Sequence, residues 1–413
     1  MTCRTRFLSI LLLASGLFFS PSASAYPEFI SRGYSSCLTC HYNGNGGGPL
    51  NDYGRALWAT EFASRFFYPK TMSEDTLAAQ SGFLGTIAMP TWFRPQIDYR
   101  GLQLHTNPGS GSSDNSQYLQ MQTDLSLVFQ TPASKYVGVI TYGHQVAPEQ
   151  FGIDGSSLDH IIAREYYLRV EVARGWWVYA GLIEKVFGLR NIDHSSYQRA
   201  YQTFNMQNNT SDGIDKSQGL ILQRTTPNWE LTVNGFIGNP NDNPQSKQSG
   251  GSVMGEYTVA ENKRLGLSLM TASSGVKNKQ MAALHYRQQV GKDSALLFEY
   301  GLIQDTPSGS TLEVGSYNFL ESTVQMVRGY KIITTIERYN SEFKAYSPDQ
   351  WRFGFGFLMF PAQRFELRTE AINLRQFSSS GAPDDTCIRT HSGRARRWFH
   401  DRQHFEKAEC GGA

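Results

Sequence analysis

The sequence predicts a mainly β protein: an up-and-down transmembrane β-barrel of about 16 strands, preceded by a small α-helical unit. Three observations predict this fold. From Pro90 onward, apolar and polar residues alternate with a period of two, the spacing of a strand with one apolar face. The links between the alternating segments are short and long in turn. After residue 25 there is no run of about 18 apolar residues, so a membrane-spanning helix is not predicted.

The first 25 residues are typical of a secretory signal. Arg4 and Arg6 precede the apolar run 7–19, and Ala-Ser-Ala at 23–25 is a small-residue cleavage site. We therefore expect the mature chain to begin near Tyr26, outside the cytoplasm. Because no cysteine lies at the cleavage point, we do not expect a lipoprotein anchor.

The segment 26–67 has at its centre Cys37, Cys40 and His41, in the C-x-x-C-H pattern of covalent c-type haem attachment. Two thiols at this spacing reach the two vinyl groups of one porphyrin edge, and the imidazole that follows ligates the iron. A disulfide, half of a zinc site and a thioredoxin-like redox pair are the alternatives. A zinc site needs a second ligand pair, and a redox pair needs a βαβ context that is missing. The remaining cysteines lie at the ends of the chain: Cys3, Cys387 and Cys410.

The residues after the motif predict a turn and then a helix. Gly-Gly-Gly-Pro at 46–49 is permissive backbone, either a flexible turn or chain that passes close to a porphyrin face. Asn51 or Asp52 is suited to start the helix. Arg55 could pair with a haem propionate, with a solvated arginine as the alternative. An apolar stripe follows at helical spacing, and it covers either the haem edge or an ordinary core: Tyr53, Leu57, Trp58, Phe62 and Phe66.

These residues carry a resemblance to a known family. The segment resembles the haem segment of outer-membrane proteins that fuse one small c-type cytochrome to a porin-like barrel, and it is more distantly similar to the fused cytochrome-porin iron oxidases of iron-oxidising bacteria. The resemblance covers about forty residues. It implies one covalent haem c and electron transfer at the outer membrane, with a periplasmic or extracellular redox partner. The matching residues are Tyr34, Cys37, Cys40, His41, Gly46, Gly47, Gly48, Leu50, Tyr53, Gly54, Arg55 and Leu57.

Residues 26–90 are expected to form the haem unit, with the cofactor as its staple because so short a unit has little core of its own. His41 is the expected proximal ligand of the iron. Met72, after the helix, is our preferred distal ligand, and a five-coordinate iron is the alternative. The other residues considered for the distal position are Met89, His105 and His194.

Residues 91–385 are expected to form the barrel. Alternation alone also fits a soluble sandwich, but the alternating links favour tight periplasmic turns and longer external loops. The short links are 131–134, 173–175, 225–228, 260–263, 290–293, 327–330 and 360–363. The long links are 105–116, 145–159, 188–216, 239–250, 271–277, 304–311, 340–349 and 378–385.

The strands also predict which faces meet lipid and lumen. Aromatic residues near strand ends, at 92–93, 176–177 and 353–360, suggest an interfacial girdle. Gly354 and Gly356 alternate with phenylalanines, which either leaves bare backbone toward the lumen and room for a plug or only weakens the strand. The long segment 188–216 is expected to fold inward as a constriction or to contact the haem unit. The expected lumen charges are Asp98, Arg100, Glu165, Arg169, Glu171, His285, Arg287, Glu299, Glu366, Arg368 and Glu370.

Three functions fit this pattern. The first is electron transfer across or at the outer membrane, by an electron-transfer protein rather than a classical enzyme. The second is a solute porin in which the haem unit is a plug, gate or sensor. The third is a structural outer-membrane protein whose cysteines form a local disulfide. A formal charge of +2 and the absence of a basic stripe argue against a nucleic-acid partner.

The end of the chain departs from the pattern. About fifteen strands are predicted up to Phe377, whereas a bacterial barrel with both termini in the periplasm needs an even number. The tail 386–413 has no alternation and carries six basic residues against three acidic ones. We therefore expect the tail to be a reading-frame artefact or disordered, and the barrel to lack its closing strand.

Overall fold

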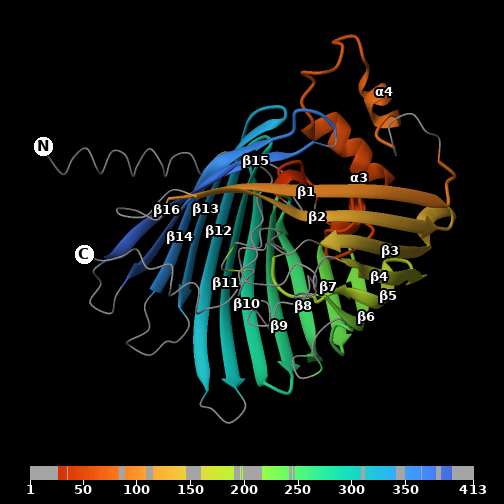
Figure 1. The fold of residues 1–413 in the computed structure, drawn as a ribbon. Helices are drawn as coiled ribbons and strands as arrows, with labels where there is room; N and C mark the ends of the chain where they lie inside the picture. The colour runs from red at the N-terminus through yellow and green to blue at the C-terminus, as the bar shows by residue number, and fades with distance from the viewer. Residues whose placement is uncertain are drawn as a thin grey trace, which may run out of the picture.

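The computed structural model describes residues 27–34, 36–82, 89–107, 115–145, 160–189, 196, 198, 216–240, 244, 247–307, 312–340, 349–363, 365–377 and 383–392. Within these residues, sixteen strands form one antiparallel sheet that closes into a barrel (Figure 1). Each strand pairs with the next in sequence, and β16 returns to β1. The predicted up-and-down topology is confirmed.

The strands vary from 8 to 16 residues in length. Their bounds are β1 Phe93–Asn107, β2 Asn115–Gln130, β3 Tyr136–Gln145, β4 His160–Ala173, β5 Trp176–Glu184, β6 Lys216–Thr225, β7 Trp229–Phe236, β8 Ser249–Ala260, β9 Lys263–Ser273, β10 Lys277–Val290, β11 Ser294–Pro307, β12 Glu313–Val327, β13 Tyr330–Asn340, β14 Asp349–Met359, β15 Leu367–Phe377 and β16 Pro383–Ser392.

The links after the even-numbered strands, two to seven residues long, lie at one end of the barrel, which we call the short-turn end. The links at the other end are longer on the whole, but 274–276 between β9 and β10 has only three residues, so the predicted alternation is not strict. The turn between β12 and β13 contains only Arg328 and Gly329. Gly329 has a φ of +86°, which favours glycine because a side chain there is strained. In barrels of this class the end with short turns faces the periplasm.

The barrel is apolar outside and polar inside. In β7 the exposed residues Trp229, Leu231 and Val233 alternate with buried Glu230 and Thr232. Such a pattern is the reverse of that in a soluble protein, because the outer face meets lipid. The barrel is therefore of the outer-membrane type.

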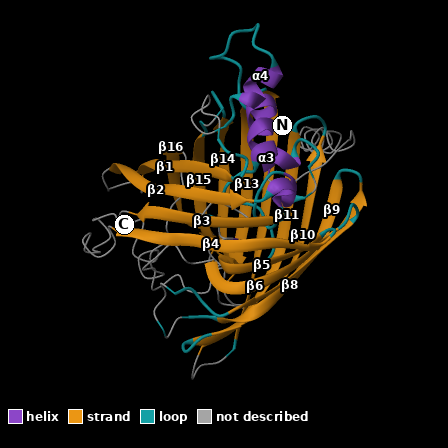
Figure 2. Ribbon diagram, turned by 90° about the vertical axis from the view of Figure 1, so that its right-hand side faces the viewer, coloured by secondary structure: helices purple, strands orange, loops and turns teal. Residues whose placement is uncertain are grey.

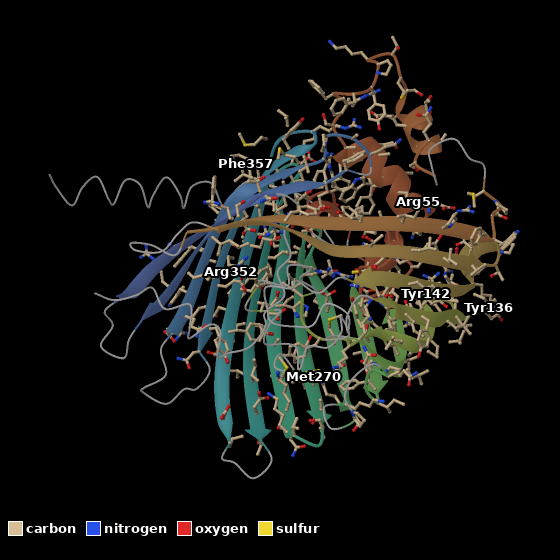
Figure 3. The ribbon with its side chains drawn as sticks, in the orientation of Figure 1. Arg55, Tyr136, Tyr142, Met270, Arg352 and Phe357 are labelled. Atoms are coloured by element: carbon tan, nitrogen blue, oxygen red, sulfur yellow. The ribbon has the colours of Figure 1, made fainter. Side chains whose placement is uncertain are left out.

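The predicted alternation in β14 is also present. Phe353, Phe355 and Phe357 are exposed on the outer face, where Figure 3 labels Phe357. The glycines between them have a different purpose from the one predicted. A Cβ on Gly354 would lie 2.2 Å from Glu370 Oε1, and a Cβ on Gly356 would lie 2.0 Å from the backbone oxygen of Thr369. The glycines therefore make room for the neighbouring strand and not for a plug.

The prediction that the barrel lacks its closing strand is wrong. In β16, Ser392 pairs with Thr369 of β15 on one side and with Gln103 of β1 on the other. The physical reason is that β1 and β15 each offer an open edge of backbone N–H and C=O groups, which an extended segment satisfies whatever its side-chain pattern. The barrel thus extends to 392, beyond the predicted boundary at 385. Residues 393–413 lie outside the described residues, so the reading-frame prediction for them is untested.

Short helices precede the barrel and gather at its short-turn end (Figure 2). They are α2 (Pro27–Ile30), the 3-10 turn η1 (Cys37–Thr39), α3 (Asp52–Leu57), the π-helical turn η2 (Trp58–Phe62) and α4 (Glu74–Ala79). We call the described residues 27–82 the haem segment, after the haem that the sequence predicts for them. None of the helices in the described part of the chain is long and apolar enough to cross a membrane.

The helix predicted after Asn51 is present but shorter than its apolar stripe implied. Asn51 caps α3 by accepting a hydrogen bond from the Gly54 N–H at 2.8 Å. Leu57 and Phe62 are buried, whereas Tyr53 and Phe66 are exposed. The stripe fails at Phe66 because Ala63 is extended and ends the helical turns.

Candidate functional site

The C-x-x-C-H residues form a single tight turn. The backbone oxygen of Cys37 accepts hydrogen bonds from the N–H groups of Cys40 at 3.2 Å and His41 at 2.9 Å. Residues three apart on such a turn lie on the same side, so both thiols and the imidazole come from one short stretch of backbone. Cys37 and Cys40 are both free thiols and are not joined as a disulfide.

Asn51 holds this turn against the start of α3. Its side-chain N–H₂ donates to the backbone oxygens of Leu38 at 3.2 Å and Thr39 at 3.0 Å. Its backbone N–H donates to the Cys40 oxygen at 2.9 Å. Gly54 completes the contact, because a Cβ there would lie 2.3 Å from the same oxygen. The resemblance to the cytochrome-porin family included Gly54, and the structure gives that glycine a packing role.

Cys40 and His41 lie in an apolar shell. Cys40 is buried in a cluster with Phe29, Phe62 and Phe360. The Phe29 ring meets the His41 ring edge-on, with 5.9 Å between the centroids. Burial raises the pKa of the Cys40 thiol to about 12 and that of Cys37 to about 11. Both thiols are therefore protonated at neutral pH in the absence of a bound group.

Cys37 faces the barrel wall. It packs against a buried cluster that includes Ile30, Leu189 and Phe319, and it contacts the Arg287 side chain. Its neighbour Ser36 donates to Glu230 Oε1 at 3.1 Å.

Glu230 belongs to a network of buried side chains of opposite charge on β7 to β10. Arg264 Nη1 pairs with Glu230 at 2.7 Å and with Glu256 at 3.1 Å. Glu256 also pairs with His285 at 3.1 Å and with Arg287. The first part of the haem segment thus reaches a charged wall inside the lumen, near its short-turn end.

The backbone of the haem segment is held by side chains of the barrel wall. Arg169 donates to the Tyr42 oxygen at 2.9 Å, and Gln223 to the Gly44 oxygen at 3.3 Å. Gln289 donates to the Ser31 oxygen at 2.9 Å. The first part of the segment, up to Gly44, therefore lies inside the barrel at its short-turn end, and we call this part the plug.

At the rim, the haem segment is attached to three short turns. Arg32 pairs with Asp293 at 2.8 Å in the turn before β11. Ser64 N–H donates to the Phe360 oxygen at 2.7 Å. Arg328 donates to the Ala63 oxygen at 2.9 Å, to the Ala59 oxygen at 3.2 Å and to the Glu74 carboxylate at 2.8 Å.

The sequence located the C-x-x-C-H turn but missed the barrel residues that hold the haem segment, such as Gln223, Gln289 and Arg328. Inward-pointing polar residues are common to every barrel strand. Nothing in the sequence distinguishes the few that touch the plug.

Arg55 and Met72 have protein partners in the structure. The Arg55 guanidinium, labelled in Figure 3, pairs with Asp52, whose carboxylate also accepts from Arg94 at 2.7 Å. The backbone oxygen of Met72 accepts a hydrogen bond from the Arg65 side chain. The propionate and distal-ligand roles stay predictions. Among the described residues, no group of three or more His, Cys, Asp or Glu side chains is arranged to hold a metal ion.

The structure describes two of the other residues considered as the distal ligand, His105 and Met89. His105 pairs with Ser116 beside the long link after β1, 12 residues from Phe93 at the short-turn end. At roughly 3.3 Å per residue this is roughly 40 Å along the strand, so His105 lies far from the plug. Met89 lies just before β1, and His194 is outside the described residues.

The start of the long segment 188–216 folds inward, as predicted. Gly188 N–H donates to Ser268 at 3.0 Å, and the Leu189 N–H donates to Glu299. Ser196 donates to Glu337 at 2.5 Å. Because Leu189 shares a buried cluster with Ile30, the segment also contacts the plug. The aromatic residues of this segment, Tyr197, Tyr201 and Phe204, are outside the described residues.

Most of the predicted lumen charges are buried inside the barrel. The buried members are Glu165, Arg169, His285, Arg287, Glu299 and Glu370. Asp98, Glu171, Glu366 and Arg368 are partly buried, and the Arg100 side chain is outside the description.

Comparisons with known proteins agree on the barrel alone. No family model and no curated protein matches the chain. An anion-selective porin from Comamonas acidovorans superposes with a TM-score of 0.52 at 8% identity, over 73% of this chain and 98% of that one. The barrel has a porin-like fold.

Two further structures support the same conclusion. The outer-membrane channel DcaP of Acinetobacter baumannii has a TM-score of 0.52 at 11% identity, over 74% of this chain and 98% of that one. Salmonella typhi OmpF in complex with daunomycin has a TM-score of 0.51 at 11% identity, over 72% of this chain and 96% of that one. At these identities the likeness shows the fold, and the cytochrome resemblance stays a prediction.

Proposed function

We propose that this chain is an outer-membrane barrel of porin type whose short-turn mouth is closed by the haem segment. One observation carries the proposal: polar side chains of the wall bind the backbone of the haem segment at Ser31, Tyr42 and Gly44. In an open channel such inward side chains would face water. Here they face an occupant, and residues 186–189 occupy the lumen as well.

Conductance in planar bilayers tests the plug. We expect the full chain to conduct weakly, and removal of wall contacts by Arg169→Ala with Gln289→Ala to raise conductance. A matched control is Arg338→Ala, which removes a pair with Asp349 at the long-loop end of β13. If the unmodified chain conducts like an open porin of the same strand number, the plug proposal is wrong.

The C-x-x-C-H turn supports a second function, electron transfer at the outer membrane. The donor set fits a covalent haem c: two free thiols and an imidazole lie on one turn beside a cluster of aromatic side chains. Bound there, a haem would supply a one-electron iron couple. Cys37 and Cys40 would hold it by thioethers and His41 would ligate the iron, while Phe29 limits the rotation of the imidazole.

The remaining residues would set the environment of this group. Asn51 fixes the backbone of the turn, and the apolar shell formed with Phe62 and Phe360 excludes water. Because the hydrocarbon core is about 30 Å thick, one haem at one mouth does not bridge it. A periplasmic or extracellular redox partner would have to approach the haem.

Haem staining after denaturing electrophoresis tests this second function. We expect a stained band for the exported chain and none after Cys37→Ala with Cys40→Ala. A His41→Ala variant should keep the barrel and the covalent haem but lose electron transfer to a redox partner. Staining that survives loss of both cysteines would exclude covalent haem at this site, and the plug proposal would stand independently.

A further inference from the structure

The chain leaves the lumen by crossing the rim between β12 and β15. After Ala63, the Ser64 N–H bonds to Phe360, and Ser64 fills the space beside Gly329, where a Cβ would lie 2.6 Å from its side chain. Two residues beyond Phe66, the Tyr68 hydroxyl accepts from the Gln363 N–H at 3.4 Å. Residues 64–68 therefore lie along the link between β14 and β15.

This crossing exposes two large apolar side chains. Phe66 is 78% exposed and Phe67 is 66% exposed. Their rings pack edge-to-face, with centroids 5.0 Å apart. Their backbone is fixed on both sides, because the Phe66 N–H donates to Ser64 Oγ at 3.1 Å and the Tyr68 N–H donates to the Arg65 oxygen at 3.0 Å. The two rings are thus presented by an ordered turn.

The same stretch of rim ends the lipid-facing surface of the barrel. Phe365, just before β15, is 65% exposed, and Leu367 follows it on the outer face. Met326 and Val327 end β12 beside Arg328, and both are 61% exposed. Ser64 and Tyr68, on either side of the phenylalanine pair, contact the turns that carry these exposed side chains. The lobe of the haem segment, residues 64–82, contains α4 and projects beyond this end of the barrel (Figure 1).

We propose that Phe66 and Phe67 insert into the headgroup region of the lipid leaflet at the short-turn end and anchor the lobe of the haem segment to the membrane surface. The occupant is phospholipid, because the pair continues an established lipid-facing surface and aromatic rings favour the interface. Lys70 is exposed in the same lobe and supplies a cation for lipid phosphates. The inference depends on the barrel's place in the outer membrane and not on a bound haem.

Fluorescence quenching in liposomes tests the anchor. Phe66→Trp and Phe67→Trp are compared with the parent by difference emission, using acyl-chain-brominated phospholipids and aqueous iodide as quenchers. We expect bromine to quench the new tryptophan strongly and iodide to quench it weakly. The control is Tyr53→Trp on α3, since Tyr53 is half exposed and its hydroxyl pairs with Tyr34 of the same segment. Strong iodide quenching and no bromine quenching at 66 and 67 would overturn the proposal.

A second measurement does not depend on tryptophan. The Phe66→Ser, Phe67→Ser double variant should be cleaved by protease within 65–80 faster than the parent in liposomes whose short-turn side is accessible. In detergent, the two proteins should be cleaved at more similar rates if lipid headgroups supply the protection. Equal rates in liposomes, or the same rate difference in both media, would show that lipid does not protect this lobe.

Discussion

Replacing Arg328 with alanine should release the lobe of the haem segment from the barrel rim. Its guanidinium donates to the oxygens of Ala59 and Ala63 and to both carboxylate oxygens of Glu74. Charged donors to partly buried carbonyls contribute about 1 kcal/mol each here, and the exposed pair with Glu74 adds at most about 1 kcal/mol because water screens it. The total of about 2 to 3 kcal/mol corresponds to an opening constant raised by about 30- to 160-fold.

Amide hydrogen exchange in micelles measures this opening. The reporters are the helical amides of α4, such as Leu77, which donates to the Ser73 oxygen at 3.1 Å. Arg338→Ala is the matched control, because Arg338 makes a bidentate pair with Asp349 at the far end of β13. If Arg328→Ala and Arg338→Ala leave the α4 amides equally protected, the Arg328 contacts do not hold the lobe.

Three further outcomes follow from the same geometry. Arg328 lowers the pKa of Glu74, so the pair stabilises docking above the unshifted pKa of about 4.3 and loses this effect as the pH falls through the lower, docked value. Hydrogen exchange should therefore show that α4 protection decreases as the pH falls below about 4.3. Gly329→Ala should lower the stability of the protein by more than Gly291→Ala, for which roughly 1 kcal/mol is expected. Both glycines have a positive φ, but only Gly329 meets a residue of the haem segment, Ser64. Thermal melts of the two variants measure the difference. Protease added to intact cells should cut within 188–216 before it cuts near residue 70, and the reverse order would invert the topology.

The barrel could be predicted because its signal repeats. Alternation in each strand and the alternation of short and long links are local, and each additional strand supports the others. The C-x-x-C-H turn was equally local, since Cys37, Cys40 and His41 are consecutive or nearly so. The structure adds the purpose of Asn51 and Gly54, which the sequence showed only as a helix start and as a residue of the family resemblance.

The docking of the plug could not be predicted, because its contacts join residues far apart in the chain. Arg328 and Ala63 are separated by 265 positions, and Gln289 and Ser31 by 258. No spacing rule connects such pairs. The closing strand was missed for a different reason. Side-chain alternation reports only on which faces are apolar, whereas β16 is held by backbone pairing to the open edges of β1 and β15.

Magnitudes decide what keeps the plug in place. The wall's hydrogen bonds to the segment compete with water, so each contributes only about 0.5 to 1.5 kcal/mol. Four large side chains of the segment are almost fully buried, namely Phe29, Ile30, Tyr42 and Phe62. At about 1.5 to 3 kcal/mol each, their burial amounts to at most about 12 kcal/mol, an upper estimate because part of it is buried within the segment itself. Apolar burial therefore contributes to holding the segment on the same scale as the polar contacts, which also set its position. The wall supplies matching apolar residues such as Leu297 and Phe319, which a water-filled channel has no need to present. The interior of this barrel is thus complementary to an occupant, which favours a resident plug over one that leaves the lumen in each gating cycle.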